Sequence, residues 1–337
     1  MLSLQLKSFR QLEVVDCRLR ELQPHEMLIK VAAAGVCGTD FHLFSGDAKS
    51  NLPVIIGHEF SGIVVDKGSS VKKFNHDDHV AVDPNIYCGE CYYCRNGKIN
   101  FCENLNALGV NINGGFSEYC IVPESQAYHV SKPYSLQNAS YAEPLSCCLR
   151  GMDIINIKHG ESVAVIGGGT IGLLMVQLAK LAGASSLVLI EPIESKRNIG
   201  LNLGANHSCS PFDEELLEKI SDLTHGGVDV VIECVGQSSA VSLAFDITKR
   251  GGRILIFGLS PTSSKIEFSL QETFYKELSI YTSLLNPFTF QRALGLLVSN
   301  QINVENFVTQ KLNLFDTQNL FYSGRNSSVI KYQFINQ

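Results

Sequence analysis

The sequence lacks the features that mark several large classes of protein. It has no excess of basic residues, because 27 lysines and arginines stand against 33 acidic residues and the net charge is −6. This balance argues against a nucleic-acid partner. The first residues show no apolar segment of the kind found in signal peptides. The most apolar long stretch, residues 170–184, contains Gln177 and Lys180 and is too short to span a membrane. We therefore expect a cytoplasmic protein with no membrane partner.

Cysteine, by contrast, is plentiful: the chain of 337 residues contains 11 of them. An odd number in clustered positions favours metal binding over disulfides in a cytoplasmic protein. Four lie close together, at Cys88, Cys91, Cys94 and Cys102. Thiolates at this spacing can close a tetrahedron around a structural zinc ion. The alternatives are an iron–sulfur cluster, a zinc ribbon that binds nucleic acid, or a loop of unpaired cysteines.

A second group of potential metal ligands lies nearer the start of the chain. Cys37, His58 and Glu59 offer sulfur, nitrogen and oxygen, a ligand set suited to zinc. Thr39 and His42 follow Cys37 and carry groups that can pass a proton to and from a metal-bound molecule. The simpler explanations are a loop hydroxyl that bonds the backbone and a histidine packed at a helix start.

A glycine-rich turn follows the apolar run at residues 162–166, which we predict to be a strand covered on both faces. Apolar residues at helical spacing come after the turn. Strand, turn and helix together indicate a dinucleotide site, in which backbone N–H groups bind the pyrophosphate. The residues of the turn expected to contact the cofactor are Gly167, Gly169, Thr170, Ile171 and Gly172.

Three further positions extend the expected cofactor site. Glu191 ends the next predicted strand and should accept hydrogen bonds from the adenosine ribose. A carboxylate there repels a 2′-phosphate, so NAD is favoured over NADP. Val235 and Gly258 close later predicted strands and are expected at the nicotinamide end, with plain strand-end packing as the alternative.

The character of the sequence changes near residue 145. Before that point, short apolar runs separated by turn residues predict a β-rich domain. Beyond it, predicted strands alternate with predicted helices, which indicates an α/β, doubly wound parallel sheet. Near residue 280 the chain leaves this pattern, and Asn286-Pro287 predicts the start of a helix that buries Phe290 and Leu297.

The motifs taken together resemble the zinc-dependent medium-chain dehydrogenase/reductase family, in its branch of sorbitol (polyol) and threonine dehydrogenases. The phrases that carry the resemblance are Gly35-x-Cys37-Gly38-x-Asp40, Gly57-His58-Glu59-x-x-Gly62, the four-cysteine loop and Glu143-Pro144-Leu145-Ser146. The resemblance implies a GroES-like β-rich catalytic domain from residues 1–145 and 282–337. It implies a Rossmann NAD-binding domain at residues 146–281.

The resemblance also implies roles for single residues. Cys37 and His58 correspond to direct ligands of a catalytic zinc, while Glu59 and Glu143 are both candidates for the remaining place, one binding the ion and one holding a water. The positions of Thr39 and His42 carry the proton relay in the family. Asp40 is expected to orient the loop, and the family places a basic residue near Lys196 against the ribose.

These inferences predict a dehydrogenase with two zinc ions per chain. Zinc polarises the hydroxyl of a secondary alcohol, such as a polyol or sugar acid, and hydride passes from its carbon to NAD. The family is commonly dimeric or tetrameric, which implies a homodimer or homotetramer here. Two rivals are a zinc-free quinone or enoyl reductase on the same fold and a non-enzymatic zinc-binding interaction protein.

Overall fold

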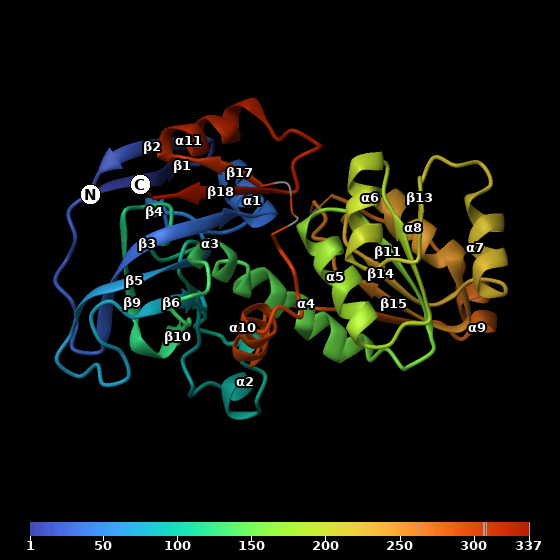
Figure 1. Cartoon of the computed structure of the whole chain (residues 1–337), viewed down its shortest axis with the longest axis horizontal. Helices are drawn as coiled ribbons and strands as arrows, with labels where there is room; N and C mark the ends of the chain where they lie inside the picture. Colours follow the sequence, from blue (N-terminus) through green and yellow to red (C-terminus); the bar gives the residue numbers. More distant parts are fainter. Residues whose placement is uncertain (262, 306, 308, 337) are drawn as a thin grey trace. The chain divides into compact units, whose positions relative to one another are not determined.

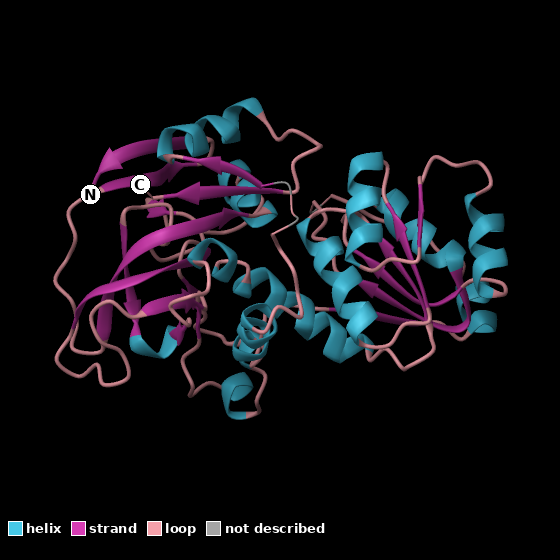
Figure 2. Ribbon diagram, viewed as in Figure 1, coloured by secondary structure: helices cyan, strands magenta, loops and turns pink. Residues whose placement is uncertain are grey.

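The structure of the chain is a computed structural model that describes residues 1–261, 263–305, 307 and 309–336. It divides into two compact units, one formed by Met1–Ser146 with Asn286–Gln337 and the other by Cys147–Leu285 (Figures 1 and 2). Within the described ranges, we find no helix with the length and apolar character needed to cross a membrane.

The first unit is built on a seven-stranded sheet, joined by a three-stranded and a two-stranded sheet. Its strands are β1 (Leu2–Ser8), β2 (Gln11–Asp16), β3 (Glu26–Val36), β4 (Val54–Ile55), β5 (Glu59–Lys67), β6 (His79–Val82), β7 (Asn85–Ile86), β8 (Asn106–Ala107), β9 (Tyr119–Pro123), β10 (Ala127–His129), β17 (Thr309–Leu312) and β18 (Lys331–Ile335). The longest, β3, pairs antiparallel with β5, β9 and β18. Strands from both ends of the chain therefore share one sheet.

The helices of this unit are short. They are α1 (Gly38–Ser45), α2 (Tyr92–Arg95), the 3₁₀ turns η1 (Ile99–Phe101) and η2 (Glu124–Gln126), α3 (Leu136–Ala139), α10 (Phe290–Val298) and α11 (Leu314–Ser323). A longer helix, α4 (Ala142–Ile155), begins in the first unit and ends in the second. The apolar core of the first unit includes the fully buried Phe60 and Phe116. It is large enough to hold rigidly the loops that emerge from the sheet.

The second unit contains one parallel sheet of six strands in the order β13-β12-β11-β14-β15-β16. These are β11 (Ser162–Ile166), β12 (Ser186–Ile190), β13 (His207–Cys209), β14 (Val228–Glu233), β15 (Thr248–Ile256) and β16 (Ser279–Thr282). Five helices connect them: α5 (Thr170–Leu181), α6 (Glu194–Leu203), α7 (Leu216–Thr224), α8 (Ser238–Ile247) and α9 (Leu270–Lys276). The order reverses between β11 and β14, and such a switch point is where doubly wound sheets bind ligands.

One helix begins later in the sequence than predicted. The helix expected to start at Asn286-Pro287 is α10, which begins at Phe290. The Asn286 side chain is buried and donates instead to Ser146 Oγ (2.8 Å) and Asp83 Oδ1 (3.2 Å). Its side-chain oxygen, the atom that would cap a helix, already accepts a hydrogen bond from Asn85 at 2.8 Å, so the local signal misled.

Candidate functional site

Three neighbouring strands of the first unit, β5, β3 and β18, bring reactive side chains together at one end of the strands. Gly35 of β3 pairs with Glu59 at the start of β5. Val36 pairs with Tyr332 of β18, which places Lys331 beside the end of β3. Cys37 follows β3 directly and precedes α1. The sheet register therefore gathers three residues that are far apart in the sequence.

The predicted ligands Cys37, His58 and Glu59 form a compact group. Their ligand atoms all lie within 4.8 Å of one another, and His58 and Glu59 are buried. A thiol, an imidazole and a carboxylate converging at this distance form a donor set that fits zinc. Burial lowers the pKa of His58, but the negative groups of Asp40 and Cys37 together outweigh burial and raise that pKa well above its ordinary value. The negative groups around His58 therefore suit a positive charge at this place, and a bound metal ion would take the place of the ring proton.

Asp40 contacts two members of this group, Cys37 and His58. It is fully buried in α1, and its Oδ2 accepts the Cys37 N–H at 2.8 Å. Its Oδ1 lies 3.3 Å from Nδ1 of His58. A carboxylate behind a histidine directs the other ring nitrogen toward a metal.

The structure also places Lys331 at the group, which the sequence did not indicate. The ammonium of Lys331 donates to Glu59 Oε2, and both side chains are almost completely buried. Burial lowers the pKa of Lys331, but the negative charges of Glu59 and Cys37 together outweigh burial and raise that pKa to about 12. No local signal could have revealed this residue, because the two partners are 272 positions apart.

The other predicted catalytic residues are Thr39, His42 and Glu143, and the first two are in the helix that follows Cys37. Thr39 is in the first turn of α1, with its hydroxyl 3.8 Å from the sulfur of Cys37. His42 follows in the same helix, and its Nδ1 lies 3.8 Å from the Asp47 carboxylate. Glu143 is buried in the first turn of α4, and it is not a member of the compact group that the described residues form.

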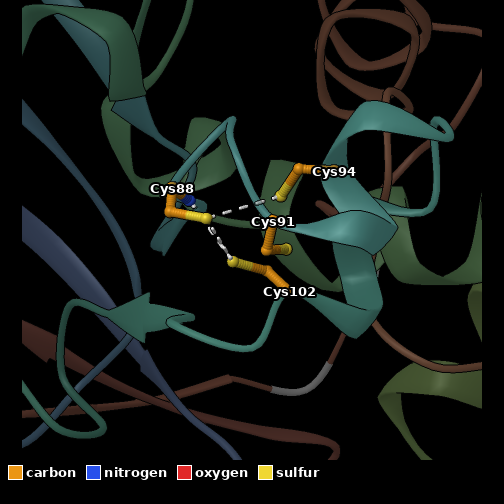
Figure 3. A group of neighbouring side chains, drawn as sticks. All are labelled: Cys88, Cys91, Cys94 and Cys102. Carbon is orange, nitrogen blue, oxygen red and sulfur yellow. Dashed lines mark hydrogen bonds between the residues drawn. The ribbon is translucent and has the colours of Figure 1, made fainter.

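The four cysteines of the loop converge as well, and Figure 3 shows their sulfurs turned toward a common centre. All four sulfurs lie within 4.8 Å of one another. Cys88 Sγ is 3.5 Å from Cys102 Sγ and 4.0 Å from Cys94 Sγ. The two turns of the loop need left-handed backbone, which Gly89 (φ 77°) and Gly97 (φ 70°) supply.

The electrostatics of the loop suit a cation. Backbone N–H groups of Glu90 and Cys91 point at Cys88 and lower its pKa to about 6. Burial and the neighbouring sulfurs raise the pKa of Cys94 to about 12. One thiolate forms readily and the next resists ionisation, so four thiolates need a bound cation between them. The donor set fits a closed tetrahedral zinc site.

The glycine-rich turn connects β11 to α5 in the second unit. Gly167 has φ 104°, and a side chain at Gly172 would overlap the Gly167 carbonyl oxygen. At Gly169, the residue before α5, an added Cβ would meet no atom within 4 Å. The helix start at Thr170 and Ile171 is therefore open to an approaching phosphate group, as the motif requires.

Glu191 follows β12 and contacts the same turn. Its Oε2 accepts the N–H of Gly168 at 2.6 Å, and its Oε1 accepts the N–H of Ile193 at 3.0 Å. The carboxylate is thus held in place by two backbone donors. Lys196 is buried in the first turn of α6.

The expected nicotinamide-side residues lie at the ends of β14 and β15. A Cβ at Gly258 would overlap the backbone of Gly236, and a Cβ at Gly167 would come within 2.8 Å of Val235. Val235 is 41% exposed. The structure therefore brings Val235 against the glycine turn, with Gly258 packed behind the next residue.

Comparison with known proteins agrees with this arrangement. Residues 23–132 match the family model described as alcohol dehydrogenase GroES-like domain, and residues 170–299 match that of zinc-binding dehydrogenase. L-threonine 3-dehydrogenase of Pyrococcus furiosus is 32% identical over 90% of this chain and 89% of its own length. D-arabinitol dehydrogenase 1 of Uromyces fabae is 32% identical over 89% of this chain and 87% of its own.

A solved structure extends the likeness to the whole chain. A zinc-binding dehydrogenase of Sinorhizobium meliloti 1021, bound to NADP, superposes with a TM-score of 0.96, at 36% identity and 99% coverage of both chains. The predicted fold class is confirmed: a GroES-like domain and a Rossmann-type parallel sheet. The chain belongs to the zinc-dependent medium-chain dehydrogenase family, whose members are oxidoreductases that use zinc and a nicotinamide dinucleotide.

Proposed function

We propose that the chain oxidises a secondary hydroxyl of a polyol, sugar acid or related compound, with NAD as the hydride acceptor and two zinc ions per chain. The observation that carries the proposal is the convergence of Cys37, His58 and Glu59 within 4.8 Å. The relatives named for L-threonine and D-arabinitol support this substrate class, because both compounds carry a secondary hydroxyl.

The chain's own residues divide the work as follows. Cys37, His58 and Glu59 hold the catalytic zinc, and Glu143 holds a water beside it or exchanges with Glu59. Bound zinc supplies a Lewis acid that lowers the pKa of the substrate hydroxyl. Thr39 accepts the hydroxyl proton and His42 passes it to solvent. The cysteine loop holds the second zinc and acts on stability alone.

The second unit supplies the acceptor site. The turn from Gly167 to Gly172 binds the pyrophosphate of NAD, with Thr170 and Ile171 donating N–H groups. Glu191 and Lys196 hold the adenosine ribose, while Val235 and Gly258 flank the nicotinamide. NAD is proposed over NADP because the Glu191 carboxylate is pinned by two N–H donors and cannot turn away from a 2′-phosphate.

We also propose that the chain works as a homodimer or homotetramer. Strand β16 ends the parallel sheet, and apolar Ile280 on it is 40% exposed. An edge strand with exposed apolar side chains is a surface that proteins cover by association. Sedimentation analysis of the purified protein tests this, and a monomer at micromolar concentration would contradict it.

Metal analysis and a substrate panel test the proposed activity. We expect two zinc ions per chain and NAD-linked oxidation of at least one compound among sugar alcohols, sugar acids and amino alcohols. Assays with NAD and NADP in parallel give the cofactor preference. One zinc per chain, held by the cysteine loop, together with reduction of quinones or enones by a nicotinamide cofactor, would replace the proposal with a reductase that has no catalytic zinc.

A further inference from the structure

Glu233 is a buried carboxylate of the second unit that has no part in the function proposed above. It is the last residue of β14, and its side chain is completely removed from water. Burial raises the pKa of its carboxyl, because it penalises the charged form. Within the part of the chain that the structure describes, Oε2 of Glu233 has no hydrogen-bond partner. A carboxylate in such surroundings costs stability, which points to a role in a neighbouring site.

Glu233 binds two turns at the ends of neighbouring strands. Its Oε1 accepts the N–H groups of Val235 at 2.6 Å and Gly236 at 2.8 Å, both in the turn after β14. Its backbone carbonyl accepts the N–H groups of Phe257 at 2.9 Å and Gly258 at 3.0 Å, both in the turn after β15. A single residue therefore joins the backbone of the two turns.

The two turns also pack directly against each other. Gly236 has φ 76°, and a Cβ there would lie 2.5 Å from the carbonyl oxygen of Leu259. A Cβ at Gly258 would lie 2.1 Å from the backbone nitrogen of Gly236. Because no side chain separates the two backbones, a shift of one turn forces a shift of the other. Glu233 holds both turns and so sets the place of the pair.

Each turn carries an exposed apolar side chain. Val235 is 41% exposed and Leu259 is 64% exposed. Both residues follow the carboxyl ends of parallel strands, at the edge where doubly wound sheets bind their cofactors. A Cβ at Gly167 would come within 2.8 Å of Val235, so the first turn also contacts the glycine-rich turn. Exposed apolar side chains at this edge suit the flat ring of a nicotinamide.

We infer that Glu233 is a positioning residue of the cofactor site: its carboxylate holds the turns after β14 and β15 in the arrangement that receives the nicotinamide ring. Glu233 does not touch the cofactor, because its side chain has no exposed surface. The inference rests on the proposed cofactor site and adds to it a residue behind the surface that the cofactor contacts. The carboxylate therefore matters for the nicotinamide half of NAD and not for the adenosine half, which Glu191 and the glycine-rich turn bind.

The test compares two probes, NADH and ADP-ribose, because ADP-ribose lacks the nicotinamide ring. Their affinities for the full-length protein are measured by fluorescence and by calorimetry in Glu233→Gln and Glu233→Ala. Glutamine keeps an acceptor oxygen without the charge, whereas alanine removes the acceptor. Glu218→Gln and Glu218→Ala are the matched controls, because Glu218 is exposed in the first turn of α7 of the same unit. Circular dichroism establishes that each variant is folded.

The ratio of the two affinities separates this role from a purely structural one. Glu233→Ala should weaken NADH binding roughly 10–100-fold, because two buried N–H groups lose their acceptor and the turns leave their place. Glu233→Gln should weaken it by about 3–10-fold, because a neutral acceptor binds the N–H groups less strongly than a carboxylate. ADP-ribose affinity should change by no more than about 2-fold in either variant. The KM for NAD should rise, while the KM for the alcohol should change little.

Each outcome decides one way. If Glu233→Ala binds NADH like the wild type, or loses affinity for both probes equally, the assignment is wrong although the proposed function stands. If Glu233→Ala does not fold, Glu233→Gln decides: a selective loss of NADH affinity supports the assignment, and an unchanged or equal loss overturns it. A wild-type chain that binds neither probe overturns both this inference and the proposed cofactor site.

Discussion

The two proposed metal sites of the first unit are built in opposite ways. The cysteine loop takes all its ligands from one stretch, Cys88 to Cys102, on half-exposed chain around α2. The cluster at Cys37 takes its ligands from the ends of two paired strands, β3 and β5, and is mostly buried. The loop depends on spacing along the chain, and the cluster depends on the register of the whole sheet. Damage to the loop should therefore appear as lost stability, and damage to the cluster as lost chemistry.

Removal of the cluster's sulfur should give the largest effect. Cys37→Ser should lower turnover by roughly 10³-fold or more, since several kcal/mol of transition-state stabilisation are lost with the metal. The measurement is kcat with the best alcohol of the panel, together with zinc content, which should fall from two ions to one. Cys17→Ser, which alters a half-buried cysteine outside both sites, should leave both values unchanged. Wild-type activity in Cys37→Ser would remove the cluster from the mechanism.

The matching change in the loop is Cys94→Ser. It should lower the free energy of unfolding by several kcal/mol, because the binding free energy of a structural zinc, about 10 kcal/mol in small zinc domains, is folding free energy. Turnover per folded molecule should change little. Thermal melting and kinetics on the same sample measure the two effects, and Tyr92→Ser, on the same loop but 70% exposed, is the control. Equal losses of stability and turnover in Cys94→Ser would contradict the assignment of the loop to stability and of the cluster to chemistry.

A third change tests whether the cluster depends on its buried support. Asp40→Asn should weaken the catalytic zinc by about 10–100-fold, because the carboxylate no longer directs the His58 ring. Competition with a chromogenic chelator measures this affinity. Asp66→Asn removes an exposed carboxylate at the other end of β5 and should have no effect. If Asp40→Asn binds zinc with wild-type affinity, the catalytic site does not depend on the contact between Asp40 and His58.

The residues of the glycine turn, like those of the cysteine loop, are neighbours in the sequence. Glu191 lies outside the turn, and changing it tests whether a residue beyond the turn sets the preference for NAD over NADP. Glu191→Ala should lower the NAD-to-NADP ratio of kcat/KM by roughly 10-fold, about 1.4 kcal/mol of lost like-charge repulsion. Glu194→Ala, at an exposed position in the first turn of α6, provides the comparison. An unaltered ratio would mean that another residue discriminates between the two ribose types.

An effect on stability alone, with no change in chemistry, is expected at Asp83, which lies between the two sites in the sequence. Burial raises the pKa of its carboxyl to about 6, so the folded state favours the protonated form. Stability present at low pH is therefore lost as the pH rises from about 4 through 6. Asp83→Asn should raise the free energy of unfolding by about 2 kcal/mol at pH 7.5 and flatten that pH dependence. Melting curves from pH 4 to 8 measure it, and an unchanged profile would assign the titration elsewhere.

Much of the molecule could be read from local pattern. The apolar run at β11, the glycines after it and the alternation of strands and helices predicted the parallel sheet. The spacing of the loop cysteines predicted a group that the structure brings within 4.8 Å. The helix start at Asn286 was predicted wrongly because its side-chain oxygen accepts a hydrogen bond from Asn85, a residue far away in the sequence that no local rule contains. The assignments of Glu143, Thr39 and His42 remain proposals.

What the sequence determined by itself are the features whose parts are neighbours in the chain: the cysteine loop, the glycine turn and the periodicity of strands and helices. Their geometry follows from backbone conformation and residue spacing, which short segments carry alone. Only the tertiary structure decided that Lys331 meets Glu59, that Gly35 makes space for them, and that Asp40 faces His58. These contacts depend on which strands pair and in what register, and that is settled by burial of the whole core.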